Sequence, residues 1–203
     1  MKILWIVALV GLLIYYIGRR LFMGISRATS VSVSGRRGFQ LVDTHSTLMG
    51  RVTRNTFSTV GFGIALLFVI LILGFKIKII LIALPLSFYL IGQFFVYNNQ
   101  LRLTKDQKLY FDAVNNEVCL ARLHGGDLYF NLLNDVAHVV EVKSVQMNRG
   151  VLFGYYKIQL KGGQMVAISH LLSQNENRVN SQFFERLQEH FKAKVETKLF
   201  PMA

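Results

Sequence analysis

Acidic residues and cysteine are scarce in this chain of 203 residues. Asp and Glu number 11 against 23 Lys and Arg, and charged residues make up 17% of the chain, below the roughly 25% of ordinary soluble domains. The single cysteine, Cys119, excludes an intrachain disulfide, and we expect its thiol to act as a small hydrophobe in a strand. Because 52% of the residues are hydrophobic, some apolar surface must face something other than water.

Motifs for catalysis and metal binding are also missing. The sequence contains no Walker-type GxxxxGK[ST] and no HExxH. A folded metal site from His124, His138 and His170 stays open as an alternative, although no spacing among them favours it. We therefore expect a protein that is not an enzyme and that needs no cofactor and no metal, with a membrane enzyme as a less favoured alternative.

Charge is absent altogether from three apolar runs, residues 3–18, 55–75 and 79–97. A membrane helix needs roughly 17–25 mostly apolar residues, so each run is interpreted as a transmembrane helix. Residues 3–18 lack a small-x-small cleavage site, and Arg19 and Arg20 follow them directly, which favours a retained span over a signal peptide. None of the three runs contains an ionisable residue, which argues against a transport pathway.

The apolar stretch from residue 60 to residue 96 is interrupted only by Lys76 and Lys78. One straight helix of that length would measure about 55 Å, against a hydrocarbon core of about 30 Å. It would also place two lysines at the bilayer centre, each costing at least about 2.5 kcal/mol. A hairpin of two spans, near 56–75 and 79–97, removes both problems. A buried hairpin in the core of a soluble protein is the alternative.

Basic residues indicate the orientation. The segment 19–54 has a net charge of +6, from seven arginines and one acid, whereas residues 98–203 carry only +3. Short loops rich in Lys and Arg stay in the cytoplasm. We therefore expect a multi-pass inner-membrane protein with its N-terminus and hairpin tip outside and its C-terminal region cytoplasmic. Contact with anionic headgroups explains the excess charge more simply than nucleic acid does.

The last hundred residues change in character, since charges return and apolar residues alternate. Short β-rich runs separated by turn residues predict antiparallel strands. The predicted strands cover 108–114, 117–123, 128–132, 136–147, 155–160 and 165–169. An amphipathic helix is predicted over 181–195, where Phe183, Phe184, Leu187 and Phe191 share one face.

This series resembles the bacterial PH-like domains found behind membrane spans. The resemblance covers about 100–195 and is carried by "KLYFDAV…EVCLARL", by the hairpin "YYKIQLKGGQMVAIS" and by the final helix. It implies a fold used mostly for binding rather than catalysis. The predicted fold is thus an α+β membrane protein, with three transmembrane helices followed by a cytoplasmic antiparallel PH-like sheet closed by a C-terminal amphipathic helix.

The predicted organisation has three parts. These are residues 1–55 with the first span and a basic loop, the hairpin 56–97, and the PH-like domain 98–203. We expect a non-catalytic adaptor or regulatory subunit that contacts membrane lipids and either a membrane-protein partner or further copies of itself. Recognition or handling of anionic lipid at the inner leaflet is the alternative. Candidate contacts with lipid or partner are the basic residues flanking the spans and two glycines at helix-packing spacing: Arg19, Arg20, Arg36, Arg37, Arg102, Lys105, Gly61 and Gly63.

Overall fold

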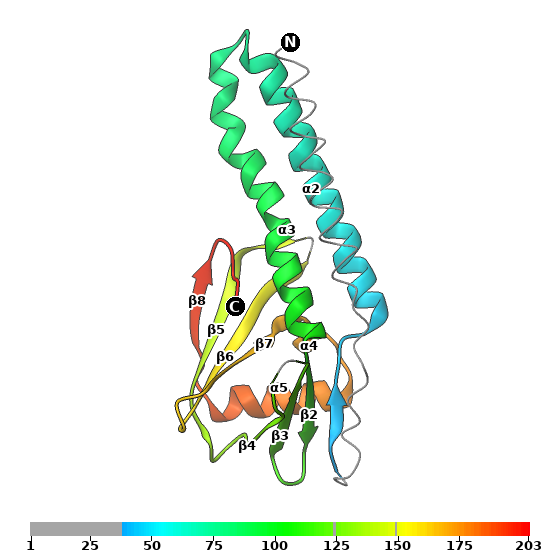
Figure 1. Cartoon of the computed structure of the whole chain (residues 1–203), viewed down its shortest axis with the longest axis vertical. Coiled ribbons are helices and arrows are strands. Elements are labelled where there is room, and N and C mark those ends of the chain that lie inside the picture. Colours follow the sequence, from blue (N-terminus) through cyan, green and yellow to red (C-terminus); the bar gives the residue numbers. More distant parts are fainter. Residues whose placement is uncertain (1–37, 124, 149) are drawn as a thin grey trace. The chain divides into compact units, whose positions relative to one another are not determined.

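The computed structural model of this chain describes residues 38–203 except residues 124 and 149. Two long helices, α2 (Ser46–Gly74) and α3 (Leu84–Lys105), form a hairpin through the short 3-10 helix η1 (Lys78–Ala83) (Figure 1). By length and composition, both arms of this helical hairpin are able to cross a membrane. The predicted first span, 3–18, lies outside the described residues.

The described strands form two four-stranded sheets. The first has the order β1-β2-β3-β4, with β1 (Gln40–Val42), β2 (Gln107–Asp112), β3 (Glu117–Arg122) and β4 (Leu128–Asn131). The second has the order β7-β6-β5-β8, with β5 (Val136–Asn148), β6 (Val151–Leu160), β7 (Met165–Ser169) and β8 (Lys194–Lys198). The short helix α4 (His170–Ser173) and the amphipathic helix α5 (Arg178–His190) lie between β7 and β8 in the chain. The α+β fold with two apolar helices and antiparallel sheets is confirmed.

The hairpin packs closely at Gly63 of α2. A Cβ placed on Gly63 would lie 2.7 Å from Cβ of Leu90 and 3.2 Å from the backbone nitrogen of Ile91, so only a glycine permits this approach. Ser87 of α3 donates a hydrogen bond from its hydroxyl to the Gly63 carbonyl at 2.8 Å. This contact joins the two arms within their uncharged segments.

Strand β1 and strand β2 flank the hairpin in the chain and pair with each other in space. Gln40 lies opposite Phe111, and Val42 lies opposite Leu109, in an antiparallel ladder. Because β1 is followed by α2 and β2 directly follows α3, the hairpin is an insertion between two neighbouring strands of one sheet (Figure 1). The sequence pattern places residues 40–42 in the basic loop, whereas the structure pairs them with β2 as a strand.

The predicted β-hairpins are confirmed. Strands β2 and β3 pair around residues 113–116, and Asn116 adopts a φ of 56° in that turn, a conformation that Asn tolerates. The buried Asp112 holds the turn together, because its Oδ1 accepts from the Val114 amide at 2.9 Å and its Oδ2 accepts from the Asn115 side chain at 2.8 Å. Strands β6 and β7 pair around the predicted turn at 161–164.

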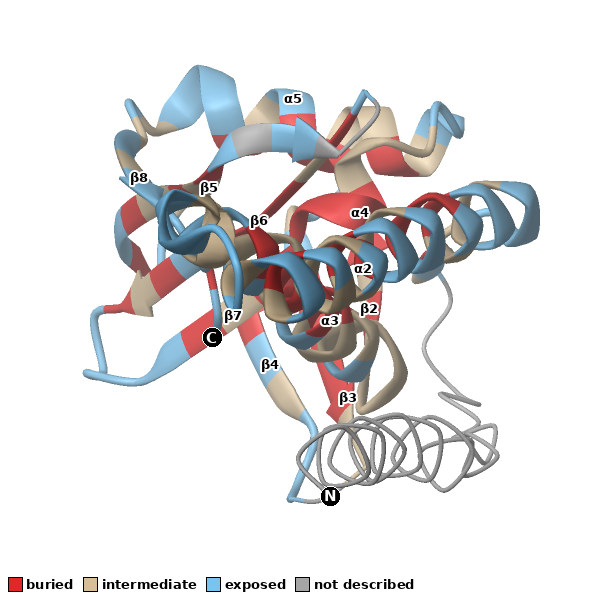
Figure 2. Ribbon diagram, turned by 90° about the horizontal axis from the view of Figure 1, so that it is seen from above, coloured by how far each residue is buried: buried red, intermediate tan, exposed pale blue. Residues whose placement is uncertain are grey.

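One hydrophobic core lies between the two sheets and α5, seen as the buried interior in Figure 2. Each strand of the first sheet and three strands of the second contribute to it, as do Phe183, Phe184 and Leu187 from α5. The ring of Phe183 packs edge-on against Phe111 of β2, with centroids 5.3 Å apart. The helix therefore meets both sheets through the apolar face predicted from its spacing.

The predicted helix over 181–195 is too long at its C-terminal end. Helix α5 ends at His190, and Phe191 has an extended backbone while still packing against the core. Residues 194–198 form β8, which runs parallel to β5 with Glu141 opposite Val195. Pairing with β8 satisfies the backbone groups at the open edge of β5, which would face solvent if residues 194–198 continued the helix. The sheets are thus antiparallel except for this pair.

Pro85 belongs to the uncharged run 79–97, where a proline inside a helix would kink it. It lies instead in the first turn of α3, after the 3-10 segment η1. Proline is tolerated there because the first amides of a helix lack an intrahelical acceptor. The irregularity therefore falls at the start of the helix rather than within it.

Candidate functional site at the base of the helical hairpin

Helix α3 continues past its apolar run into a polar last turn. Arg102 and Lys105 lie in that turn, where cations interact favourably with the carbonyl end of the helix. Arg102 Nε lies 3.6 Å from Asp106 Oδ2, and both side chains are largely exposed, so this ion pair contributes little to stability. The turn therefore presents positive charge at the point where the chain leaves the hairpin.

A hollow of about 340 Å³ lies beside this turn. The ladder between β2 and β3 places Gln107 opposite Arg122, so Arg122 joins Arg102 in its wall. The lining consists of Asn99, Arg102, Leu103, Asp106, Gln107, Arg122 and Ala203. Among the side chains of this lining, two guanidinium groups lie with one carboxylate, and arginine binds phosphate and carboxylate groups through paired hydrogen bonds. This hollow, the α3-base pocket, suits a small anionic group.

Gln100 holds the last turns of α3, beside the α3-base pocket, against the rest of the domain. Its side chain is fully buried, and its Oε1 accepts a hydrogen bond from Ser169 Oγ at 2.7 Å. Ser169 in turn caps α4, accepting from the Leu171 amide at 3.2 Å. Buried polar groups are costly unless paired, so this contact holds α3 against the junction of β7 and α4.

A second cluster of titratable groups lies inside the second sheet. His170 Nε2 is 2.8 Å from Glu141 Oε1, and Lys143 Nζ is 2.9 Å from Glu141 Oε2. His170 Nε2 makes no hydrogen bond with any described residue in this position, so its contact with Glu141 is one of close approach. The Tyr156 ring stacks on His170 with centroids 4.4 Å apart. The cluster is held between β5, β6 and α4.

Burial controls the protonation of this cluster. It lowers the pKa of His170 below 6.5, although the nearby Glu141 carboxylate partly opposes that shift. Burial likewise raises the pKa of Tyr156 to about 12. Neither ring therefore carries charge near neutral pH, and the cluster is suited to packing rather than to proton transfer with a substrate.

The predicted contact residues are divided by the structure. Arg19, Arg20, Arg36 and Arg37 lie outside the described residues. Gly63 faces α3, whereas a Cβ on Gly61 would meet no heavy atom of the described residues within 4 Å.

Of the predicted basic contacts on α3, Arg102 lines the pocket and Lys105 does not. Sequence reasoning missed Arg122, although the register of the predicted hairpin 108–123 places it beside the end of α3. Within the described ranges, no three His, Cys, Asp or Glu side chains gather as metal ligands.

Comparison with known proteins identifies the β-rich region. A family model described as PH domain matches residues 41–179, from β1 through the helical hairpin to the start of α5. The PH-like part of the resemblance inferred for residues 100–195 is thereby confirmed, and the matched range ends at residue 179 and also takes in the hairpin. Comparisons with curated proteins and with solved structures found no match.

Proposed function

This chain belongs to the PH domain family, and from that premise we propose that it is a non-catalytic integral inner-membrane adaptor. In this role its PH domain binds a protein partner within a membrane complex. PH domains are binding modules in which function depends on the particular site rather than on the fold. The rings of Tyr156 and His170 are buried, which supports a role without catalysis.

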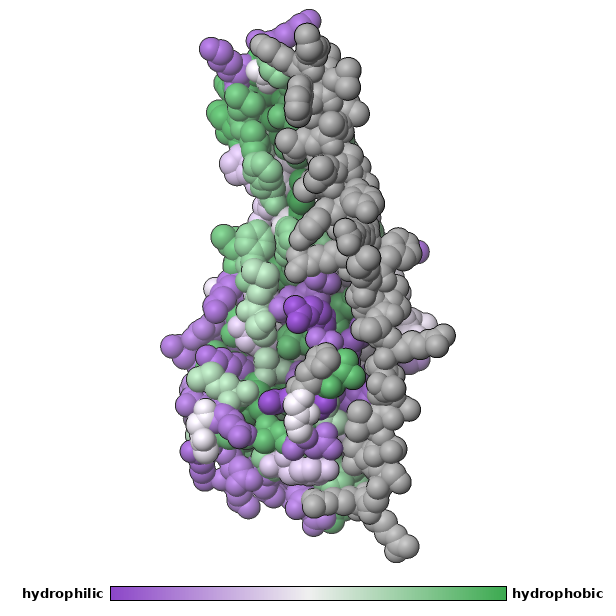
Figure 3. All heavy atoms as spheres, in the orientation of Figure 1, coloured by the Kyte–Doolittle hydropathy of each residue, from purple (hydrophilic) through white to green (hydrophobic). Residues whose placement is uncertain are grey.

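The exposed apolar surface of the hairpin, which is inserted between β1 and β2, supports the membrane part of the proposal. Large apolar side chains project outward along both arms, as the hydrophobic surface above the domain in Figure 3 shows. They include Phe62, Ile72, Phe75, Ile79, Ile82 and Phe88, each more than half exposed. Exposed apolar surface on this scale is stable in lipid and not in water.

The topology proposed from the charge distribution completes this arrangement. Residues 3–18 provide a third crossing, and the arginine-rich segment 19–37 lies with the PH domain on the cytoplasmic side. The N-terminus and the tip of the hairpin, with Lys76 and Lys78, face the opposite side. Helix α5 closes the sheets in this proposal, since its apolar face supplies Phe183 and Phe184 to the core.

The end of the domain remote from the hairpin is the proposed partner surface. Val114 in the β2–β3 turn is 86% exposed, and it borders a hollow of about 390 Å³. The rest of the lining comes from that turn, from the β4–β5 turn and from α5: Asn116, Leu133, Arg186, Glu189 and His190. An apolar side chain beside mixed charges resembles the centre and rim of a small protein interface.

Site-specific photo-crosslinking in intact cells tests the adaptor role. A photoreactive amino acid at Val114 should yield a defined crosslinked species. The same probe at Lys157, an exposed position on β6, should not. A Val114→Glu variant with a probe at the neighbouring Leu133 should lose the species. Membrane-inserted protein that crosslinks no partner from either Val114 or Leu133 would exclude this surface.

Recognition of anionic lipid is the second candidate, and the α3-base pocket favours it. Two arginines lie where α3 leaves its apolar run, at the depth of the headgroup layer in the proposed topology. Short-chain phosphatidylglycerol should raise the thermal stability of the purified protein in detergent, because a ligand that binds only the folded state stabilises it. Short-chain phosphatidylcholine should not.

A charge-matched pair of variants makes this test specific. The double variant Arg102→Gln with Arg122→Gln should lose the stabilisation by phosphatidylglycerol. Lys157→Gln with Lys161→Gln removes the same charge from exposed positions and should retain it. Equal responses of both variants would show general electrostatic attraction and would rule out the pocket as the lipid site.

A further inference from the structure

Phe200, which follows β8, lies against the uncharged part of α3. A Cβ on Gly92 would come within 2.6 Å of the Phe200 ring, so the absence of a side chain at residue 92 makes room for it. The rings of Phe200 and Tyr89 have centroids 5.7 Å apart. Gly92 and Tyr89 precede Tyr97, the end of the uncharged run, by about 7.5 and 12 Å along the helix.

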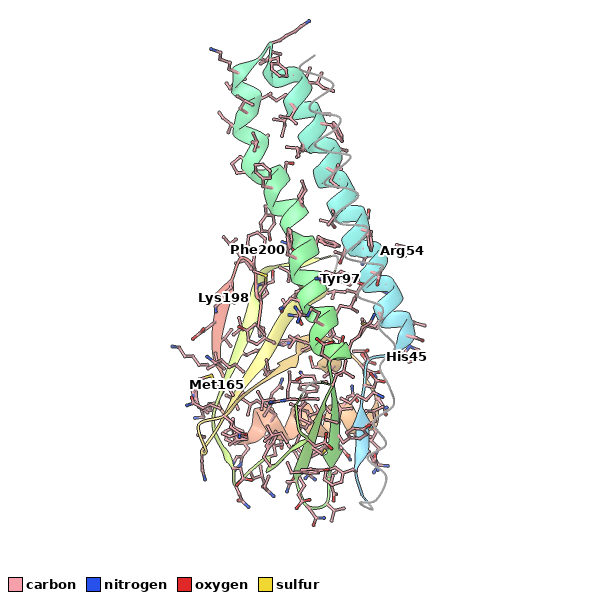
Figure 4. The ribbon with its side chains drawn as sticks, in the orientation of Figure 1. His45, Arg54, Tyr97, Met165, Lys198 and Phe200 are labelled. Atoms are coloured by element: carbon pink, nitrogen blue, oxygen red, sulfur yellow. The ribbon has the colours of Figure 1, made fainter. Side chains whose placement is uncertain are left out.

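The position of Phe200 along the hairpin agrees with this depth. Figure 4 places Phe200 level with Arg54, where the charged part of α2 ends, and nearer the hairpin tip than Tyr97. Thr53 and Tyr97 join the two arms at this level through a hydrogen bond of 2.7 Å between their hydroxyl groups. On both helices the uncharged segment therefore begins near this hydrogen bond, and Phe200 lies on the hairpin-tip side of Tyr97 (Figure 4).

The residues around Phe200 are held in place by α3. Asn99 exchanges two hydrogen bonds with the backbone of Ala203, at 3.1 and 3.0 Å, and the Pro201 ring is buried. Leu199 and Met202 on either side are 58% and 51% exposed. The segment 199–203 is therefore fixed along the helix with two apolar side chains turned outward.

The neighbouring strand ends in the same way. Ser144 of β5 pairs with Lys198 of β8 in parallel, so both strands continue from that pair in one direction. Beyond it, β5 exposes Val145 and Met147, at 56% and 67%. Together with the segment after β8, they form a group that we call the apolar collar: Val145, Met147, Leu199, Phe200 and Met202.

We propose that the apolar collar enters the cytoplasmic-side interface of the bilayer and binds the upper acyl chains of the lipid. The inference rests on the proposed membrane function and adds a second lipid contact, made by the PH domain itself. Lipid is the occupant that the structure favours, since the collar continues the exposed apolar surface of α3 and Phe200 lies alongside the uncharged run. Lys198, which directly precedes Leu199, is exposed, so its ammonium group can reach the phosphates of the lipid headgroups.

The collar gives the domain a fixed position on the membrane surface. The Gln100–Ser169 hydrogen bond already holds α3 against the domain. The collar adds an attachment to the lipid itself, through β5 and the 199–203 segment, and further limits tilting of the domain. The surface around Val114 would then be presented at a constant height and angle.

Depth-dependent fluorescence quenching tests the proposal on the full chain. Cysteines at Leu199 and Met202 would carry a polarity-sensitive fluorophore in vesicles of phosphatidylcholine and phosphatidylglycerol that contain acyl-chain nitroxide lipid. Val114→Cys is the distal control, and Phe88→Cys, on the exposed face of α3, is the span control. The wild-type chain is the blank, because its Cys119 is fully buried.

We expect quenching at residues 199 and 202 close to that at residue 88 and well above that at residue 114. Quenching at 88 with none above the distal control at 199 and 202 would overturn the collar and leave the membrane hairpin standing. Absence of quenching at 88 would contradict the membrane proposal itself. Replacing Gly92 with Leu displaces Phe200 and should reduce quenching at 202 while leaving residue 88 unchanged; an unaltered signal at 202 would also count against the collar.

Discussion

Adding one methyl group at Gly63 should separate the arms of the helical hairpin. In Gly63→Ala the new carbon would lie 2.7 Å from Leu90 Cβ, whereas carbon atoms pack at about 3.5–4.0 Å, so the helices must part by about 1 Å. Overpacking of this kind costs about 1–3 kcal/mol. The Ser87 hydrogen bond to the Gly63 carbonyl, 2.8 Å long, would also be lost, and such interhelical bonds contribute about 0.6 kcal/mol.

Gly61→Ala is the matched control for this change. It adds the same methyl group two residues away on the same helix, where no heavy atom of the described residues lies within 4 Å of the new carbon. Both variants gain the same helix propensity, about 1 kcal/mol, so their difference reports the steric contact together with the Ser87 hydrogen bond that it breaks. We expect Gly63→Ala to be less stable than Gly61→Ala by about 1.5–3.5 kcal/mol.

Thermal unfolding in detergent, followed by far-ultraviolet circular dichroism, measures this difference. For a protein of this size it corresponds to a difference in Tm of roughly 3–14 °C. Urea titration under the same conditions gives the free energies where heating is irreversible. Equal stability of the two variants, or greater stability of Gly63→Ala, would refute the reasoning, because α2 and α3 could not then pack at Gly63.

Three further predictions follow from buried polar groups. Burial lowers the pKa of His170 in the folded protein below the ordinary value of 6.5. Between the folded-state pKa and 6.5 the unfolded chain binds more protons than the folded protein, so stability should fall as the pH drops below about 6.5. His170→Gln should flatten this pH dependence in urea titrations, and an unchanged pH dependence would contradict the reasoning. Gln100→Leu should cost about 1–3 kcal/mol by leaving the buried Ser169 hydroxyl without an acceptor for its proton, seen as a lower urea midpoint, whereas a neutral effect would mean that water replaces the amide. Asp112→Ala should remove the β2–β3 turn bonds and lower the urea midpoint at neutral pH. Because hydrogen bonds from Val114 and Asn115 lower the pKa of Asp112, this loss should shrink as the pH falls through that lowered pKa, and a pH-independent loss would exclude the carboxylate's role.

The α3-base pocket and the apolar collar differ in how far sequence could reach them. Arg102 was predicted as a contact because it flanks an apolar run. Its neighbour in the pocket, Arg122, is in the next strand but one, and only the register of the β2–β3 ladder brings it there. The collar combines residues of β5 with residues of the segment that follows β8, and these two strands are far apart in the chain and pair in parallel. No periodicity within either segment signals that pairing.

Local patterns also failed where a long-range contact determined the secondary structure. Residues 40–42 are too short a run to predict a strand, and they become one because β2 offers an open edge beside the hairpin. Residues 191–195 continue an apolar helical spacing, yet β5 draws 194–198 into its sheet. In both cases the backbone hydrogen bonds come from a partner that the local sequence does not contain.

Sequence alone determined the helical hairpin, the two tight β-hairpins and the apolar face of α5. Each depends on spacing between residues that are near neighbours in the chain, or on the absence of charge over a length set by the bilayer. Tertiary structure alone decided that β1 and β2 enclose the hairpin, that Gln100 and Phe200 join α3 to the sheets, and that two arginines share one pocket. These features depend on which strand edges and helix faces meet after the chain has folded. A pattern of neighbouring residues carries no information about contacts between segments that are far apart in the chain.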